Sequence, residues 1–299
     1  MKKFNALLIR NNKLFIRDKS TVFFSILSVL ILISLYFLFI GKQYASGLVE
    51  GTSGTALGGS ESKAYFLVYL QMMAGIMVLN SVSLCTGVYG TLARDFETRK
   101  IDSFLITHTK TFEILLSYLA SGFSVSYMLN MLTWIITVVL ITVLTGYSIA
   151  ASTFITVTIA LLLVSFVGAS IMLLVTAFVK SSAAVGVITG ILGTFFGFLC
   201  GIYMPLTQLG SAAGYVGSIL PFTHLSVWLK NIVLKNAFNE LNITSPEFKD
   251  VLLSNFTADN IGFLGININL SVMLLLCAAV SVLCAVGAYG ILARRVKNN

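Results

Sequence analysis

The side chains that could carry out chemistry are few in this sequence, and they are not arranged for catalysis. The two histidines, His108 and His224, lie far apart along the chain, and no Ser/His/Asp set or pair of carboxylates is evident. The sequence has no GxxxxGK[ST] phosphate-binding loop. The cysteines lie within or beside apolar runs without metal-type spacing: Cys85, Cys200, Cys277 and Cys284. We therefore expect this chain to hold no catalytic residues, metal or cofactor of its own.

Uncharged polar and small residues interrupt the long apolar runs. Gln71, Asn80 and Asn130 either hydrogen-bond between packed helices or line a substrate path. Glycines recur near every fourth position of one run, a pattern that favours close helix packing within one bundle or across a dimer. These glycines are Gly186, Gly190, Gly193, Gly197 and Gly201.

The composition indicates a membrane protein. Of 299 residues, 57% are hydrophobic and 10% are charged, whereas about a quarter of the residues in a soluble domain are charged. The mean hydropathy is +0.95. A net charge of +8 could indicate a nucleic-acid partner in a soluble protein, but here it is explained by basic residues in cytoplasmic loops. We expect this chain to lie in a lipid membrane and to bind no nucleic acid.

The charge-free runs predict a single all-α transmembrane domain over 1–299 with six membrane-spanning helices. A bilayer core of about 30 Å requires about 20 apolar residues per helix. The predicted spans are 20–41, 65–92, 114–144, 149–179, 182–203 and 269–293. Fourteen of the nineteen basic residues then fall on the side of the two termini. Because basic residues accumulate in cytoplasmic loops, both termini are predicted to be cytoplasmic.

Two further segments carry information outside the spans. Residues 2–17 place their apolar side chains near one helical face, which predicts an amphipathic helix in the inner membrane interface, or a simple positive anchor for the first span. Residues 204–262 form a re-entrant and extracellular element in our interpretation, because Pro205 and Pro221 break an apolar stretch that would otherwise be helical. An interfacial loop anchored by Trp228 is the alternative.

The densest charge cluster of the chain, RDFETRKIDSFLITHTK at 94–110, resembles a motif of the ABC-2 family of exporter permeases. The family pattern is roughly E-[RK]-E-x-G-T-[LF]-E-x-L-L-x-[ST]-P. Arg99 stands where glycine is usual, and His108 where proline is usual. The counterparts of the pattern in this sequence are Asp95, Glu97, Ile101, Asp102, Phe104, Leu105 and Thr107.

A second stretch is similar to the same family. GIYMPLTQLGS, followed by ILPFTHLSVWLKNIV, resembles the family's segment after the fifth span, with a proline-containing turn and a re-entrant motif. Pro205, Pro221, Thr223 and His224 match that motif. With the six spans and the N-terminal helix, the resemblance covers nearly the whole chain.

The resemblance implies a permease subunit of an ATP-driven exporter in a bacterial plasma membrane. A coupling helix over 96–107 would dock a separate ATPase, which would bind ATP and Mg²⁺, and a second permease copy, identical or related, would complete the transporter. The apolar side formed by Ile101, Phe104 and Leu105 can insert into a groove of that ATPase. The charged residues that would orient the helix are Arg94, Asp95, Glu97, Arg99, Lys100 and Asp102.

The substrate class that suits an uncharged path is an amphipathic drug, toxin, peptide or lipid-like molecule. Two other classes of function stay open. An ion-coupled secondary transporter would need a buried ionisable residue or an internal repeat, and neither is evident in the sequence. A non-transporting membrane scaffold or sensor would not need the charged docking segment.

Overall fold

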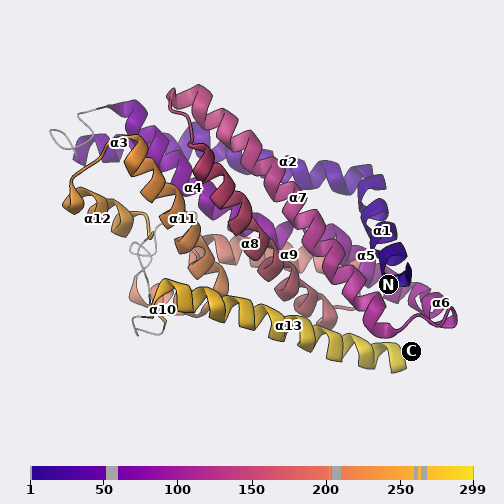
Figure 1. The fold of residues 1–299 in the computed structure, drawn as a ribbon. Coiled ribbons are helices and arrows are strands. Elements are labelled where there is room, and N and C mark those ends of the chain that lie inside the picture. The colour runs from indigo at the N-terminus through magenta and orange to yellow at the C-terminus, as the bar shows by residue number, and fades with distance from the viewer. Residues whose placement is uncertain are drawn as a thin grey trace.

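The computed structural model describes residues 2–51, 60–201, 203, 210–258, 262–263 and 268–298. This part of the chain is helical and contains no β-sheet (Figure 1). The helices of 16 residues or fewer are α1 (Lys2–Arg17), the π-helical turn η1 (Tyr36–Ile40), α3 (Gly41–Gly51), α5 (Thr86–Glu97), α6 (Lys100–Ile106), α10 (Ser211–Ile219) and α12 (Pro246–Asn255). The helices of 17 residues or more are α2 (Lys19–Leu35), α4 (Glu61–Ser83), α7 (Thr111–Thr145), α8 (Ala151–Phe178), α9 (Ser182–Leu199), α11 (Pro221–Glu240) and α13 (Leu270–Asn298).

Six helical stretches are long and apolar enough to cross a membrane, the number that the sequence predicts. Each exceeds or approaches the roughly 20 residues that a bilayer core requires. They run over Lys19–Glu50, Glu61–Glu97, Thr111–Thr145, Ala151–Phe178, Ser182–Leu199 and Leu270–Lys297. The fold is therefore that of an all-α, multi-pass membrane protein.

Two of these stretches differ from the predicted spans, the first at its end and the second by an internal break. The first does not stop near residue 41, because α2 continues through η1 into α3. In η1 the carbonyl oxygen of Phe37 accepts a hydrogen bond from the Tyr69 hydroxyl at 3.2 Å, and Ala45 of α3 is buried. Contacts with α4 thus extend a helix over residues whose composition indicates a loop. The second stretch breaks at Leu84 and Cys85, between α4 and α5.

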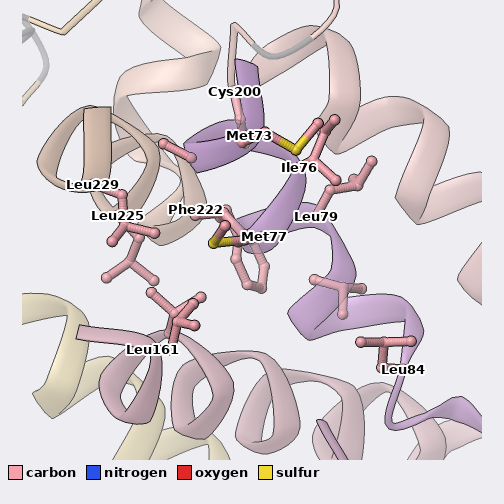
Figure 2. Packing of buried hydrophobic residues seen from close by; sticks show 14 of the residues in the cluster. Met73, Ile76, Met77, Leu79, Leu84, Leu161, Cys200, Phe222, Leu225 and Leu229 are labelled. Atoms are coloured by element: carbon pink, nitrogen blue, oxygen red, sulfur yellow. The ribbon is translucent and has the colours of Figure 1, made fainter. Parts of the chain in front are cut away.

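The centre of the bundle is α4. In the most apolar window of Glu61–Glu97, 94% of the residues are buried, against 17% in that of Leu270–Lys297. Figure 2 shows Met77 of α4 beside Phe222 of α11, while Met73 and Ile76 point to another side of α4; all belong to the buried hydrophobic cluster, as does Leu161 of α8. Any movement of α4 must therefore displace several neighbouring helices, because cores are packed nearly as densely as crystals.

The segment that the sequence assigns to a re-entrant element contains α10, α11 and α12. Pro221 occupies the first turn of α11, where its missing N–H costs nothing, and α11 packs against α4, α8 and α13. At its far end, the Glu240 carboxylate accepts a hydrogen bond from the Ala150 backbone N–H at 2.7 Å, which ties α11 to the α7–α8 turn. Pro205 lies outside the described residues.

The two ends of the bundle carry different elements. Both termini lie at one end, together with α1 and α6, and we refer to it as the terminal end (Figure 1). The opposite end carries α3 and α12 (Figure 1). This arrangement agrees with an even number of spans.

Candidate functional site

The charged segment at the terminal end forms a tight helix–turn–helix connection. α5 ends at Glu97, and Arg99 then takes a left-handed conformation with φ of 53° before α6 begins. His108, after the end of α6, is also left-handed with φ of 54°, and its N–H donates to the Leu105 carbonyl oxygen at 2.9 Å. The two positions at which the sequence departs from the ABC-2 pattern are thus the two left-handed residues that bracket α6.

The apolar side of α6 faces its own chain. Ile101 is buried in the hydrophobic cluster, and the half-buried Phe104 and Leu105 pack against it. The expectation is that this side inserts into a partner, whereas in the structure it packs against α5 and the buried cluster of its own chain, with the Arg10 guanidinium of α1 over the Phe104 ring. The outward side carries Lys100, Ser103 and Ile106, the last of them 79% exposed.

A buried ion pair links three helices beneath α6. The Arg10 guanidinium of α1 lies 2.7 Å from the Asp95 carboxylate of α5, and the Tyr118 hydroxyl of α7 donates to the same carboxylate oxygen at 2.5 Å. Arg10 also donates to the Tyr118 hydroxyl oxygen at 3.0 Å, and its guanidinium lies 4.8 Å from the centre of the Phe104 ring. Asp95 is only 2% exposed, so this member of the predicted docking set is buried against its own chain.

Further hydrogen bonds attach α1 to its neighbours. The Lys3 ammonium donates to the carbonyl oxygens of Thr107 and His108 at 2.8 and 3.0 Å, just after α6. The Asn11 amide donates to the Ser117 hydroxyl of α7 at 3.3 Å. Helix α1, which the sequence assigns to the membrane interface, therefore connects the end of α6 to α7.

The α5–α6 turn is linked to α9 and α13 as well. The Glu97 carboxylate accepts a hydrogen bond from the Ser182 N–H in the first turn of α9, at 3.2 Å. The Arg295 guanidinium of α13 donates to the Val179 carbonyl oxygen at 2.9 Å and lies 4.5 Å from the centre of the Phe96 ring. Of the predicted docking residues, Arg94, Glu97 and Arg99 are exposed, and Asp102 is half-buried.

A groove of about 570 Å³ opens between α2, α4–α5 and α9. Hydroxyl groups and glycines dominate its lining, including Ser25, Thr86 and Gly190. At Gly186 and Gly190 a side chain would meet nothing within 4 Å, so this part of the glycine stripe faces open space instead of packing closely within the chain.

One charged residue of each sign marks the terminal end of this groove, Asp18 and Arg94. Asp18 caps α2, where its carboxylate accepts hydrogen bonds from the Thr21 N–H at 3.1 Å and the Thr21 hydroxyl at 2.8 Å. These bonds, aided by the Arg94 charge, lower the pKa of Asp18. A carboxylate and a guanidinium thus stand at the mouth of a groove whose walls are otherwise uncharged.

The three polar residues considered for a substrate path have separate positions. Asn80 lines the groove, and its amide nitrogen lacks a hydrogen-bond partner among the described residues. Asn130 is fully buried in α7, and neither its amide nitrogen nor its oxygen has a described partner. Gln71 is buried in the central helix α4. The structure brings only Asn80 to the groove.

The described residues of the second family-like stretch lie in the protein interior. The His224 ring and the Ser218 carbonyl oxygen are 2.7 Å apart, and the Thr223 hydroxyl donates to the Leu199 carbonyl oxygen at 3.4 Å. Both side chains are buried, and burial lowers the pKa of His224. They join α11 to α10 and to the end of α9.

Lys230 of α11 is a buried cation that the sequence analysis did not single out. It is 1% exposed, and its ammonium donates to the carbonyl oxygens of Gly201 and Phe256 at 2.8 and 3.1 Å. The charge count placed Lys230 among the five basic residues on the side opposite the termini. Hydropathy does not distinguish a buried lysine from an exposed one. Its flanking apolar residues at helical spacing, such as Val227 and Leu234, were the available indication.

Six long apolar helices define the class of the chain as a multi-pass membrane protein. The model of the ABC-2 family transporter protein matches residues 52–286, most of the chain. The chain therefore belongs to the ABC-2 transporter family, and it is an ABC transporter permease, the transmembrane component. A search of curated proteins found no match.

Proposed function

We propose that this chain is the permease subunit of an ATP-driven exporter and that it docks a separate ATPase at the terminal end, with both termini in the cytoplasm. The observation that carries the proposal is the attachment of α6: the Arg10–Asp95–Tyr118 cluster joins α1, α5 and α7, and from α1 the Arg10 guanidinium contacts the Phe104 ring of α6 while Lys3 binds the two carbonyl oxygens that follow α6. A helix fixed in this way can pass a displacement to the bundle instead of absorbing it.

The path of such a displacement follows the chain. α6 is joined by a two-residue turn to α5, and α5 leads into the central helix α4. Rigid-body movement of packed elements is a common form of transmission in switching proteins. Closure of two ATPase subunits around ATP and Mg²⁺ would push on α6, and α4–α5 would carry that push into the bundle.

The docking surface in this proposal is the outward side of α6 and the adjoining turn. Its apolar side is already covered by the chain itself, so the contact with the ATPase rests on Arg94, Glu97, Arg99 and Lys100, with Ile106 as an exposed apolar contact. Charged groups at the rim of an interface orient partners and speed their association.

The groove between α2, α4–α5 and α9 is our proposed wall of the translocation path. A groove open on one side becomes a path only when another surface closes it, and a second permease copy, identical or related, would provide that surface. Hydroxyl-rich walls with apolar members such as Phe24 and Leu79 suit an amphipathic molecule without a full charge. Drug-like, toxin-like, peptide and lipid-like molecules fit this description.

Co-purification tests the docking proposal. The affinity-tagged protein, extracted from its native membrane in a mild non-ionic detergent, is expected to retain an ATPase that contains a phosphate-binding loop, identified by mass spectrometry. Lys100→Glu should lower the retained ATPase severalfold. Lys235→Glu is the matched control, because Lys235 is an exposed lysine near the opposite end of the bundle.

Two results would contradict the proposal. One is that the wild-type protein retains no such ATPase. The other is that Lys100→Glu and Lys235→Glu retain equal amounts. A secondary transporter or a scaffold would give the first result, and docking at another surface would give the second.

A further inference from the structure

A second cavity of about 200 Å³ lies on the other side of the bundle, between α7, α8 and α13. Four side chains of α7, two of α8 and four of α13 line it, and all are hydrocarbon apart from the Tyr289 hydroxyl. Nothing in the proposed docking or translocation uses this cavity, which we call the α13 groove.

The α13 groove lies in the half of the bundle next to the terminal end. Its α7 residues begin at Phe112, one residue after the start of that helix, and its α13 residues extend to Tyr289, near the end of that helix. The two rings meet edge to face, with centroids 5.7 Å apart. They close the apolar part of the groove toward the membrane surface.

Basic residues follow immediately beyond these rings. Lys110 directly precedes α7, and Arg294 follows Tyr289 by five residues, about 7.5 Å along the helix axis. Lys297 lies eleven residues, or about three turns, after Val286 and so continues the side of α13 that lines the groove. Lys110, Arg294 and Lys297 are exposed.

The other charges of this region leave a positive excess. Arg295 is engaged with Val179 and Phe96 on another side of α13. Glu113 is the nearest acid along α7, and it lies about 100° around the helix from Phe112. Two exposed cations, Lys110 and Lys297, therefore lie beyond the end of the hydrocarbon groove, and the exposed Arg294 adds a third positive charge about 140° around the α13 axis from Tyr289.

We propose that the α13 groove binds one anionic phospholipid, with an acyl chain between α7, α8 and α13 and the phosphate group near Lys110, Arg294 and Lys297. The apolar lining holds the chain by van der Waals packing, since a lipid chain in the bilayer is already out of water. The cations select the charge, because basic residues near the membrane surface attract anionic head groups. This site is separate from the docking surface and does not depend on the proposed function.

Fluorescence quenching by brominated lipids tests the site. Phe112→Trp places a reporter in the groove, and the protein is reconstituted into vesicles of phosphatidylcholine and phosphatidylglycerol in which one of the two lipids is brominated. Brominated phosphatidylglycerol is expected to quench this reporter severalfold more effectively than brominated phosphatidylcholine at equal mole fraction. The same protein without the substitution provides the background from Trp134 and Trp228.

Two sets of variants separate the parts of the proposal. Combined Lys110→Gln, Arg294→Gln and Lys297→Gln should reduce the preference to about one, whereas Lys235→Gln should leave it unchanged. Ala285→Phe fills the groove and should reduce quenching by both lipids, whereas Leu283→Phe, on an exposed side of α13 outside the groove, should not. Equal quenching by the two lipids, or a preference that survives removal of the three cations, would overturn the proposal.

Discussion

The Arg10 guanidinium and the Asp95 carboxylate meet at 2.7 Å, although 85 positions separate the two residues along the chain. The pair joins α1, which lies outside the six apolar stretches, to α5, which continues the central one. The Lys3 ammonium of α1 also binds the carbonyl groups of the two residues that follow α6. We therefore expect a displacement of α6 to carry α1 with it.

Removing the charge of Asp95 should destabilise the protein. Asp95→Asn leaves the Arg10 guanidinium without its carboxylate, and breaking a buried pair costs about 3–5 kcal/mol. The Arg10 side chain is 27% exposed, so water offsets part of that loss, and we expect about 2 kcal/mol. Thermal unfolding of the detergent-solubilised protein measures the change.

The matched control for this prediction is Asp102→Asn. Asp102 belongs to the same charged segment but is half-buried on α6 and takes no part in the cluster around Arg10. We expect a change within about 0.5 kcal/mol, as at ordinary surface positions. Equal losses in the two variants would show that the ion pair adds nothing specific to stability.

The left-handed residue Arg99 predicts a stabilising substitution. A side chain in this conformation costs about 1–2 kcal/mol, and Arg99 has φ of 53°. Arg99→Gly removes that cost, less the entropy that glycine gains in the unfolded chain, so the unfolding temperature should rise slightly. Lys100→Gly, one residue later inside α6, should lower it by contrast, and a fall in both variants would contradict the argument.

The unfolding temperature also tests the conformation of His108, where we expect the family's usual residue to lower it. Proline is usual in the family pattern at this position, but its ring restricts φ to about −65°, whereas His108 has φ of 54° and donates its N–H to Leu105. His108→Pro should therefore destabilise the α6–α7 turn, and His108→Gly should not. The turn of this chain has its own geometry, which the resemblance alone did not specify.

Close contact between α4 and α8 occurs at Gly168. A Cβ atom there would lie 2.5 Å from the Ser81 carbonyl oxygen, a backbone atom that cannot move away cheaply. Gly168→Ala should therefore destabilise the bundle by about 1–3 kcal/mol. Gly186→Ala is the control in a neighbouring helix, because nothing lies within 4 Å of that site, and it should be neutral or slightly stabilising. Indistinguishable unfolding temperatures for the two variants would contradict the packing.

Hydropathy predicted much of this fold because the bilayer imposes it. Segments such as 114–144 and 149–179 must be helical and apolar to cross a membrane, and α7 and α8 occupy nearly those bounds. The extension of α2 into α3 could not be predicted in this way, since it depends on contacts of Ala45 and Phe37 with α4.

A short helix, α6, lies inside the range 96–107 over which the sequence predicts a coupling helix. The sequence did not indicate which side of that helix its own chain covers. Helical spacing identifies an apolar side of α6 but does not say what covers it, so Ile101 and Phe104 were assigned to a partner although they pack against their own chain. Asp95 likewise became a docking residue, because a sequence does not reveal that Arg10 lies beside it. The docking role itself stays a prediction.

The buried Lys230 predicts a distinct pH dependence of stability. Burial lowers its pKa to about 8 from 10.5, and α11 is not one of the six candidate spans. Between these two values the unfolded chain binds a proton that the folded chain does not, so stability should rise as pH increases from about 8 to 10.5. The unfolding temperature should therefore be several degrees higher at pH 9.5 than at pH 8, relative to a Lys230→Met variant in which this contribution is absent. Lys235→Met, an exposed position on the same helix, should retain the wild-type slope, and a Lys230→Met variant with that same slope would refute the assignment.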